Sequence, residues 1–390
     1  MSRLKKTSRP KTTGKPAARL TGQKVSLKFL ADYLGLSPAT LSLVMNRSAV
    51  ADSIPKATQD QIFAAADKFN YRPNFLARSL RTQRSFTIGV IVPEISEGYE
   101  TLVLSGIEEH LLREGYFYFV ASHHHRPDLI DEYPRLLLDR AVEGLIAVDT
   151  PWHHHLPIPV VTVSGHNDAN HDANPVTNIV PNIVTNTVAN IVTNIVLDHR
   201  RAAELALEHL FKLGHRRIAF IKGQEFSSDT EARWDAIVQA AAQFGLTVDP
   251  KLTTQLHGEV PTPDLGYRVT RRLLAKHEPF SAIFAFNDIS AIGAIRALRE
   301  NGLRVPEDVS VVGFDDIQSA AYQNPGLTTV RQPLSEMGKI AAETVLRRIA
   351  RDSTEQRADH PRQITVEPEL VIRESTGKAR RGDGAKSSRR

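Results

Sequence analysis

The chain has 390 residues, of which 41% are hydrophobic and 24% charged, and this composition predicts a folded protein with more than one domain. It contains no cysteine, which excludes disulfides and thiolate metal sites, and no apolar run approaches the roughly 20 residues needed to cross a bilayer. The basic N-terminus is followed by no apolar segment of the secretory type, so we expect a cytoplasmic protein without a membrane partner.

The net charge of +5 is unevenly distributed. Residues 1–84 hold 16 Lys and Arg against four Asp, a charge of +12, and residues 376–390 add +5. Residues 85–375 carry the balance of −12. A basic first fifth on an acidic body is typical of a phosphate-binding module joined to a domain that does not bind nucleic acid. Both basic ends, residues 1–23 and 376–390, are predicted to be disordered tails.

Three short helices are predicted after the first tail. Ser26 can cap a helix that ends at Gly35, and Ser37 with Pro38 can begin a second helix. The positions expected to point inward are Leu27, Leu30, Ala31 and Leu34 in the first helix and Leu41, Val44 and Met45 in the second. A third helix near 57–69 would close a small core. Two short helices around a tight glycine turn, the second exposing small and polar groups, predict an all-α helix-turn-helix headpiece over residues 24–72.

From residue 87 onward the pattern alternates between strand and helix. The strands are expected at 87–93, 116–121, 144–149, 160–165, 218–222, 282–286 and 309–314, with helices at 100–114, 201–213, 230–244 and 289–301 among them. Two runs of such alternation predict two doubly wound parallel sheets, an α/β fold of two lobes. Ligands of these folds bind beyond the carboxyl ends of the strands, so the cleft between the lobes is the predicted ligand site.

Several motifs of the chain resemble those of one family. They are N-Y-R-P-N at 70–74 with Ala77 and Leu80, L-G-H-R-R-I-A at 213–219, F-N-D at 286–288, V-V-G-F-D-D at 311–316, P-G-L-T-T-V-R-Q-P at 325–333 and P-E-L-V-I-R-E-S at 368–375. The headpiece adds Leu30-Ala31, Gly35-Leu36-Ser37, Thr40-Leu41-Ser42 and Asn46. With these residues the chain resembles the LacI/GalR (lactose-repressor) family over essentially all of 25–375. The resemblance implies a headpiece, a hinge and a periplasmic-binding-protein-like sensor domain. It also implies a nucleoid-associated transcriptional repressor that binds a pseudo-palindromic DNA operator as a homodimer.

The same resemblance implies two sets of DNA-binding residues. In the family the second helix enters the major groove, and the matching positions are Pro38, Ala39, Thr40, Ser42, Leu43 and Asn46. Hinge positions at the minor groove are Tyr71, Asn74, Ala77, Arg78, Leu80 and Arg81, with Leu80 as the apolar wedge that kinks the duplex. Leu43 stands where many members carry an arginine that can bind guanine, so the operator sequence stays open.

The resemblance further implies allosteric control by a small-molecule effector, a sugar or sugar derivative. Arg233, Asn287 and Asp315 match effector-binding positions, and their side chains suit sugar hydroxyls. Alternatively, Asn287 and Asp315 cap turns and Arg233 lies on a helix surface. The remaining predicted effector contacts are Tyr99 and Trp152, which with Glu97 lie in loops after strands, and Gln332. Whether the effector induces or co-represses stays open, as does dimer against tetramer.

No cofactor or metal is expected. The triplets His123–His125 and His153–His155 have no companion carboxylate or cysteine at ligand spacing, and adjacent histidines splay apart in regular structure. No nucleotide-binding loop, nucleophile elbow or H-E-x-x-H motif occurs, so an enzyme is not predicted. Two rivals are a solute-binding protein of a transport system, which would need no headpiece, and a sugar-modifying enzyme.

Asparagine recurs every four residues from Asn174 to Asn194, which indicates a low-complexity insertion. We predict a loop at about 172–196, where the family passes from the last N-lobe strand to the first C-lobe helix, although an extended ribbon also fits the period. The predicted division is a headpiece at 24–72, a hinge at 73–85, and a sensor at 86–375, with an N-lobe at 86–165 and 328–352 and a C-lobe at 197–325 and 363–375.

Overall fold

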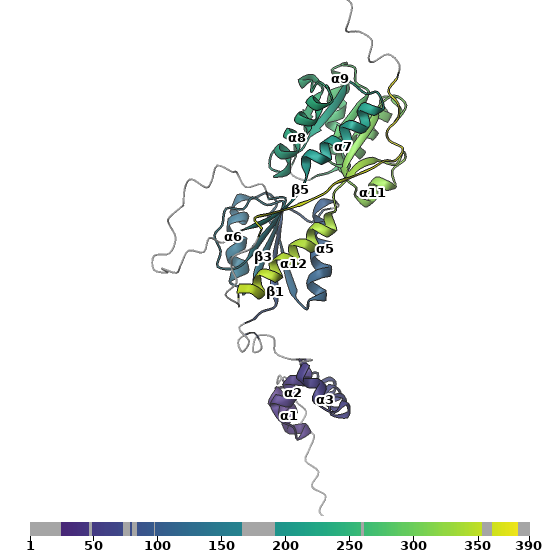
Figure 1. The fold of residues 1–390 in the computed structure, drawn as a ribbon. Coiled ribbons are helices and arrows are strands. Elements are labelled where there is room, and N and C mark those ends of the chain that lie inside the picture. Colours follow the sequence, from purple (N-terminus) through teal and green to yellow (C-terminus); the bar gives the residue numbers. More distant parts are fainter. Residues whose placement is uncertain are drawn as a thin grey trace, which may run out of the picture. The chain divides into compact units, whose positions relative to one another are not determined.

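The computed structural model describes residues 25–46, 49–72, 79, 84–96, 98–165, 192–258, 261–352 and 361–380. They belong to two compact units, Met1–Arg84 and Ser85–Arg390 (Figure 1). The predicted hinge at 73–85 lies almost entirely outside the described residues. Every described helix is too short or too polar to span a bilayer.

The first unit is the expected small helical headpiece. Its elements are α1 (Leu27–Leu34), α2 (Pro38–Met45), η1 (Ala49–Ser53) and α3 (Lys56–Lys68). The predicted caps are confirmed, because the Ser26 hydroxyl accepts a hydrogen bond from the Phe29 amide at 3.1 Å and the Ser37 hydroxyl accepts one from Thr40 at 3.0 Å. Gly35 ends α1 with φ +66°, a left-handed conformation that glycine adopts without strain. The core of this unit includes Leu30, Leu41 and Ile62, all fully buried.

The N-lobe of the second unit contains a parallel six-stranded sheet in the order β11-β5-β4-β3-β1-β2. Its strands are β1 (Thr87–Val92), β2 (Phe117–Ser122), β3 (Gly144–Val148), β4 (Val160–Val163), β5 (Thr193–Leu197) and β11 (Gln363–Val366). Helices α5 (Tyr99–Arg113) and α12 (Leu334–Asp352) pack on one face, and α6 (Pro127–Leu138) covers the other (Figure 1).

The C-lobe contains a second sheet in the order β12-β10-β9-β8-β6-β7, parallel except for β12. Its strands are β6 (Ile218–Lys222), β7 (Thr253–Gln255), β8 (Ala282–Ala285), β9 (Ser310–Asp315), β10 (Thr328–Arg331) and β12 (Glu369–Val371). The helices are α7 (His199–Lys212), α8 (Asp229–Gln243), α9 (Pro263–Ala275), α10 (Asp288–Glu300) and α11 (Gln318–Ala321), with η3 (Pro250–Leu252) before β7. The two predicted parallel sheets are therefore confirmed.

The chain crosses between the lobes three times, and this corrects the predicted lobe boundaries. The crossings lie between β5 and α7, between β10 and α12, and between β11 and β12. We expected 328–352 wholly in the N-lobe and 363–375 wholly in the C-lobe. Instead β10 pairs with β9 in the C-lobe sheet, and β11 pairs with β5 in the N-lobe sheet. The alternation of elements does not reveal which sheet a short strand at a crossing joins, because hydrogen bonding between strands decides it.

The asparagine repeat does not end in a loop, which corrects the prediction for 172–196. Its last residues form β5, in which Ile195 is fully buried. The Asn194 amide accepts a hydrogen bond from the Thr162 hydroxyl at 2.8 Å and also donates to the Gly165 carbonyl. A four-residue period is compatible with a strand because alternate residues share a face. The repeat before residue 192 lies outside the described residues.

The beginning of the predicted C-terminal tail is fixed on the C-lobe. Nε2 of His215 donates to the Gly377 carbonyl at 3.0 Å, and the Ala379 amide donates to the Leu213 carbonyl at 2.9 Å. The Thr376 hydroxyl lies 2.9 Å from Nε2 of His209. The prediction of a disordered tail from residue 376 onward is thus wrong for 376–380. That prediction rested on composition alone, whereas in the folded protein two histidines of the C-lobe contact this segment.

Two glycines allow α5 and α12 to pack with their backbones in close contact. A Cβ atom on Gly106 would lie 1.8 Å from the Ser335 carbonyl oxygen, and one on Gly338 would lie 2.0 Å from the Val103 carbonyl oxygen. Backbone atoms cannot rotate out of the way as a flexible side chain can. The helix pair therefore depends on the missing side chain on each helix.

We expect Gly106→Ala to destabilise the sensor unit by about 1–3 kcal/mol, since an added methyl group must push two packed helices apart. Calorimetric unfolding of the full chain measures this. The matched control is Ser105→Ala, at the neighbouring exposed position, where the change should stay within about 0.5 kcal/mol. Equal unfolding temperatures for the two variants would show that the helices can separate without cost.

Candidate functional site

A cleft of about 600 Å³, including its part open to solvent, lies between the two lobes. Five carboxylates line it, from Glu94, Glu100, Asp149, Asp229 and Asp315. The other lining residues are Tyr99, His125, Gln224, Phe226, Ser227, Arg233, Pro261, Phe286, Asn287 and Ile289. Most of these residues follow the carboxyl ends of parallel strands in both sheets, where this fold places its ligands.

The cleft brings together four of the six predicted effector residues: Tyr99, Arg233, Asn287 and Asp315. Gln332 is buried behind this lining and contacts Asp315. The expectation that Trp152 presents its ring to a ligand is wrong. Its ring belongs to the N-lobe core around Leu145 and Val160, and only 8% of the residue is exposed. The indole of Trp152 packs inward because the loop after β3 folds back over the sheet.

Arg233, on α8, is held rigidly in the cleft. Its guanidinium lies between two aromatic rings, 4.3 Å from the centroid of Phe286 and 3.8 Å from that of Phe314. One amino group donates to the Phe286 carbonyl at 2.6 Å and the other to the Asp229 carboxylate at 3.0 Å. Arg233 Nε is buried and has no hydrogen-bond partner among the described residues. The side chain thus retains a donor, and its position does not depend on a ligand.

Asn287 caps a helix, as the alternative interpretation of the sequence proposed. Its side chain accepts a hydrogen bond from the Ser290 amide at 2.9 Å and caps α10, and the Ser290 hydroxyl completes the capping box. The amide oxygen is therefore already engaged, while the residue still lines the cleft. Asn287 combines the capping and the lining roles.

Asp315 ends β9 with an uncommon backbone conformation, φ +110°. Gln332 donates from its amide nitrogen to this carboxylate at 2.6 Å, and the Gln332 oxygen has no partner among the described residues. Burial raises the pKa of Asp315 to about 7, and Arg233 opposes the shift. The group can therefore accept or donate a hydrogen bond near neutral pH.

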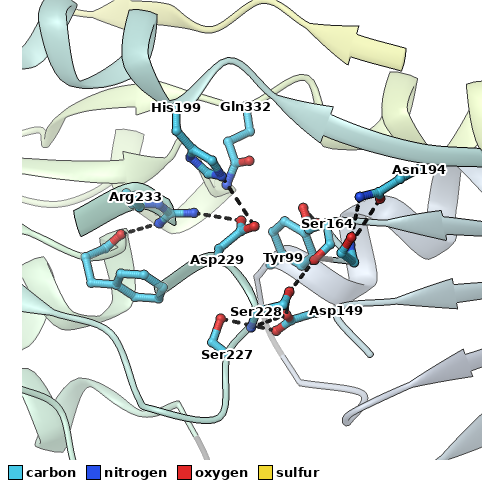
Figure 2. A network of polar contacts seen from close by, with 12 residues as sticks. Tyr99, Asp149, Ser164, Asn194, His199, Ser227, Ser228, Asp229, Arg233 and Gln332 are labelled. Atoms are coloured by element: carbon cyan, nitrogen blue, oxygen red, sulfur yellow. Dashed lines mark hydrogen bonds and ion pairs between the residues drawn. The ribbon is translucent and has the colours of Figure 1, made fainter. Parts of the chain in front are cut away.

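Asp149 connects the two lobes across the cleft. Its carboxylate, just after β3, accepts hydrogen bonds from the Ser228 amide at 3.1 Å and from the Ser228 hydroxyl at 2.6 Å (Figure 2). The same hydroxyl contacts the Ser164 carbonyl, and the Tyr99 hydroxyl donates to the Ser164 hydroxyl at 2.6 Å. Burial raises the pKa of Asp149 to about 6, with a further contribution from Asp229. This network holds the lobes together at the N-terminus of α8.

Two of the three crossings carry a side chain that contacts a cleft carboxylate. His199, directly after the first crossing, places Nε2 at 3.4 Å from the Asp229 carboxylate. Gln332 lies in the second crossing and bonds to Asp315 (Figure 2 shows both residues). The cleft carboxylates are therefore in direct contact with two of the segments that connect the lobes.

Sequence reasoning missed the acidic character of the cleft. Glu94, Glu100, Asp149 and Asp229 were not predicted, although three signals were available. Asp149 directly follows a buried strand, and Asp229 lies one helical turn before Arg233. Glu100 lies in the first turn of α5, directly after Tyr99.

In the headpiece, α2 exposes only part of the predicted DNA-binding set. Pro38 and Ala39 are exposed, whereas Thr40, Ser42, Leu43 and Asn46 are half-buried. The Asn46 amide donates to the Ser42 carbonyl at 2.7 Å, and Leu43 packs against the headpiece core. Tyr71 also packs against this core. Asn74, Ala77, Arg78, Leu80, Arg81 and the loop residue Glu97 lie outside the described residues.

The two histidine triplets have different environments. His123 is buried, with Nε2 3.1 Å from the Thr150 hydroxyl, and burial lowers its pKa to about 4. In the second triplet, Nε2 of His153 and of His154 lie 2.9 and 3.5 Å from Oδ1 of Asp131. We expected adjacent histidines to point apart and to have no carboxylate nearby, and this is wrong for the second triplet. The irregular loop orients the rings of His153 and His154 toward Asp131 on α6.

A helix-turn-helix unit joined to two parallel-sheet lobes around a polar cleft defines a class of DNA-binding regulators with a periplasmic-binding-protein-like sensor. Residues 207–376 match the family model of the periplasmic binding protein-like domain. The chain is 30% identical over 359 residues to the HTH-type transcriptional repressor PurR of Haemophilus influenzae (strain PittEE), covering 90% of this chain and 98% of that protein. The chain belongs to the LacI/GalR family of DNA-binding transcriptional regulators.

Two solved structures are similar over most of the chain. A lac repressor dimer bound to operator and the anti-inducer ONPF has a TM-score of 0.73 at 23% identity, covering 91% of this chain and all of that one. The transcriptional regulator CelR in complex with cellobiose has a TM-score of 0.62 at 26% identity, covering 90% of this chain and 99% of that one.

Proposed function

We propose that this protein is a repressor rather than an enzyme, acting in the cytoplasm at the nucleoid. In this proposal a homodimer binds a pseudo-palindromic operator, and a neutral, hydroxyl-rich effector of the sugar class binds in the cleft. The observation that carries the proposal is the acidic cleft with one rigid arginine, located in a sensor that follows a helix-turn-helix unit.

The charges of the cleft support a neutral polyol. Its five carboxylates can accept hydrogen bonds from hydroxyl groups, and Arg233 can donate to a sugar oxygen. The rings of His125 and Phe226 lie 3.8 Å apart, centroid to centroid, and add two aromatic side chains in contact with each other to the lining. A phosphorylated or carboxylated effector would have to compete with Asp229 for Arg233, and it would be repelled by Asp149, whose pKa of about 6 leaves it mostly ionised at neutral pH. The similar CelR structure is a complex with cellobiose.

The arrangement supports allosteric control through cleft closure. The Ser228–Asp149 hydrogen bonds join the lobes, while His199 and Gln332 connect the cleft carboxylates to two crossings. An effector that displaces or strengthens these contacts favours one arrangement of the lobes over another, and the DNA affinity would follow by linkage. Binding of the effector and binding of DNA are then thermodynamically coupled.

The edge of the N-lobe sheet supports a homodimer. Strand β2 is an edge strand, and it exposes 58% of Phe117 and 37% each of Phe119 and Val120. Leu112 on α5 is likewise 58% exposed. Unpaired edge strands with exposed aromatic residues are unfavourable in a monomer. A second copy of the chain is the proposed occupant, since a dimer is also what two operator half-sites require.

We expect Phe117→Glu to shift the protein from dimer to monomer, because it places a charge in the proposed interface. Sedimentation equilibrium measures the change in dissociation constant. The control is Gln239→Glu, which places the same charge at an exposed polar position of α8 in the C-lobe and should not affect assembly. A Phe117→Glu protein that dimerises as tightly as the control would contradict the assigned interface.

Selection of bound DNA from a random duplex library, with and without candidate effectors, tests the proposed function. We expect a palindrome with a flexible central step, and its half-site would define what α2 and Leu43 contact. Leu80→Ala should weaken operator binding while leaving binding in the cleft unchanged. General, salt-sensitive DNA binding without an enriched sequence would overturn the proposal.

Thermal-shift screening of candidate ligands tests the proposed class of effector. Tighter binding of a sugar phosphate than of any neutral sugar would overturn the proposal of a neutral effector.

A further inference from the structure

A second group of ligand-type side chains lies outside the cleft, on the N-lobe. It consists of Asp131 on α6 and of His153 and His154 in the loop between β3 and β4. One ligand atom from each residue lies within 4.8 Å of the others. No part of the function proposed above uses these three side chains.

The spacing of the three groups suits a small transition-metal ion. Ligands of a tetrahedral Zn²⁺ site, with bonds of about 2.0–2.1 Å, lie roughly 3.3 Å from one another. Nε2 of His153 and of His154 lie 2.9 and 3.5 Å from the Asp131 carboxylate oxygen, close to that separation. The ring centroids of the two histidines are 4.3 Å apart, and the Nε2 atoms of both rings lie nearest the same carboxylate oxygen, Oδ1 of Asp131. Small shifts would accommodate an ion among them.

The loop holds His154 in place before any ion binds. The indole nitrogen of Trp152, whose ring is buried in the N-lobe core, donates to the His154 carbonyl at 3.1 Å. The His154 side chain is only 15% exposed, and its Nε2 makes no hydrogen bond with a described residue. By contrast, His153 and Asp131 are more than half exposed, which leaves room for a water ligand. One buried and two accessible ligands make a preorganised, open site.

We propose that Asp131, His153 and His154 bind one divalent transition-metal ion of the Zn²⁺ type, with water as the remaining ligand. Two imidazoles and one carboxylate favour Zn²⁺ over hard ions such as Mg²⁺, which prefer oxygen ligands. The absence of cysteine leaves histidine as the main soft ligand of this chain.

A bound ion would join two segments that border the cleft. The loop follows Asp149 directly, and α6 begins two residues after His125. Asp149 and His125 both line the cleft. The metal would thus fix the loop against α6 at the N-lobe side of the effector site, and it should stabilise the folded protein by mass action.

The test is a Zn²⁺ titration of the metal-free, full-length protein by calorimetry, with Mg²⁺ as the comparison ion. We expect one Zn²⁺ per chain, a higher unfolding temperature on binding, and no comparable effect of Mg²⁺. His153→Ala and Asp131→Asn should each weaken Zn²⁺ binding by about 100-fold or more, since loss of a direct ligand exceeds the 10–100-fold effect of an outer partner. Both residues are exposed, so the metal-free variants should unfold like the parent protein.

His155→Ala is the matched control, because His155 is the exposed neighbour in the same triplet. It should retain the parent affinity and stoichiometry. Three results would overturn the proposal: no Zn²⁺ binding up to 100-fold molar excess, unchanged affinity in His153→Ala and Asp131→Asn, or equal loss in His155→Ala. The last two would place the ion on other histidines.

Discussion

Arg233→Ala is expected to destabilise the sensor unit by about 3–5 kcal/mol, because removing one partner of a buried ion pair leaves the other charge uncompensated. Arg233 is 3% exposed and pairs with Asp229, and its positive charge also favours the ionised form of Asp315. Its removal further empties the space between the rings of Phe286 and Phe314. Calorimetric unfolding of the full chain measures the loss.

Two further variants separate charge from packing at this site. Arg271→Ala removes an exposed arginine on α9 and should change stability by no more than about 0.5 kcal/mol. Adding Asp229→Asn to Arg233→Ala should recover part of the lost stability, since the buried carboxylate that has lost its arginine partner is then replaced by a neutral amide. A double variant no more stable than Arg233→Ala would show that the ring packing, and not the ion pair, makes the arginine indispensable.

The parts of the fold that depend on local chemistry were predictable from the sequence. Ser26, Gly35 and Ser37 define their helices through neighbouring backbone groups, so the residue types alone indicate the caps. The buried strands were predictable from their apolar runs. The crossings were not, because the place of β10 and β11 depends on pairing with strands far away in the chain.

The same division applies to the candidate site. Arg233, Asn287 and Asp315 follow from motifs that resemble the family, and the cleft contains all three. The prediction for Trp152 was wrong because the sequence does not reveal the course of the loop. That course decides whether an aromatic ring on the loop faces the cleft or the core. The contact between Asp131 and His153 could likewise not be predicted from the sequence. The two residues are 22 positions apart in the chain, and only the folded loop brings them together.

The stability of the sensor unit is expected to fall as the pH rises from about 6.5 to 8.5. Burial raises the pKa of Glu100 from 4.5 to about 8 and that of Asp315 from 3.8 to about 7, with repulsion from Asp149 contributing at both groups. In this window the folded state therefore binds protons that the unfolded state has released, and the free energy of unfolding decreases with pH. This stabilisation is complete below about pH 4 and is lost as the pH passes through the folded values.

Buried histidines act in the opposite direction, but at lower pH. Burial lowers the pKa of His123 from 6.5 to about 4, so that residue destabilises the fold only as the pH falls below 6.5. Above pH 6.5 its contribution is nearly constant, and the slope there belongs to the buried carboxyls, among them Asp288, whose pKa burial raises well above its usual value. Each unit of pKa difference corresponds to about 1.4 kcal/mol, so the slope is measurable.

Glu100→Gln should flatten the decline above pH 6.5, because a neutral amide in the same place has no proton to lose. Glu109→Gln, at an exposed position on the same helix, is the control and should keep the parent slope. Urea unfolding midpoints at pH 6.5, 7.5 and 8.5 compare the three proteins. If Glu100→Gln retains the parent slope, Glu100 is ionised in the folded state throughout this window. The cleft would then carry the negative charge of Glu100 at neutral pH, which would strengthen the case against an anionic effector.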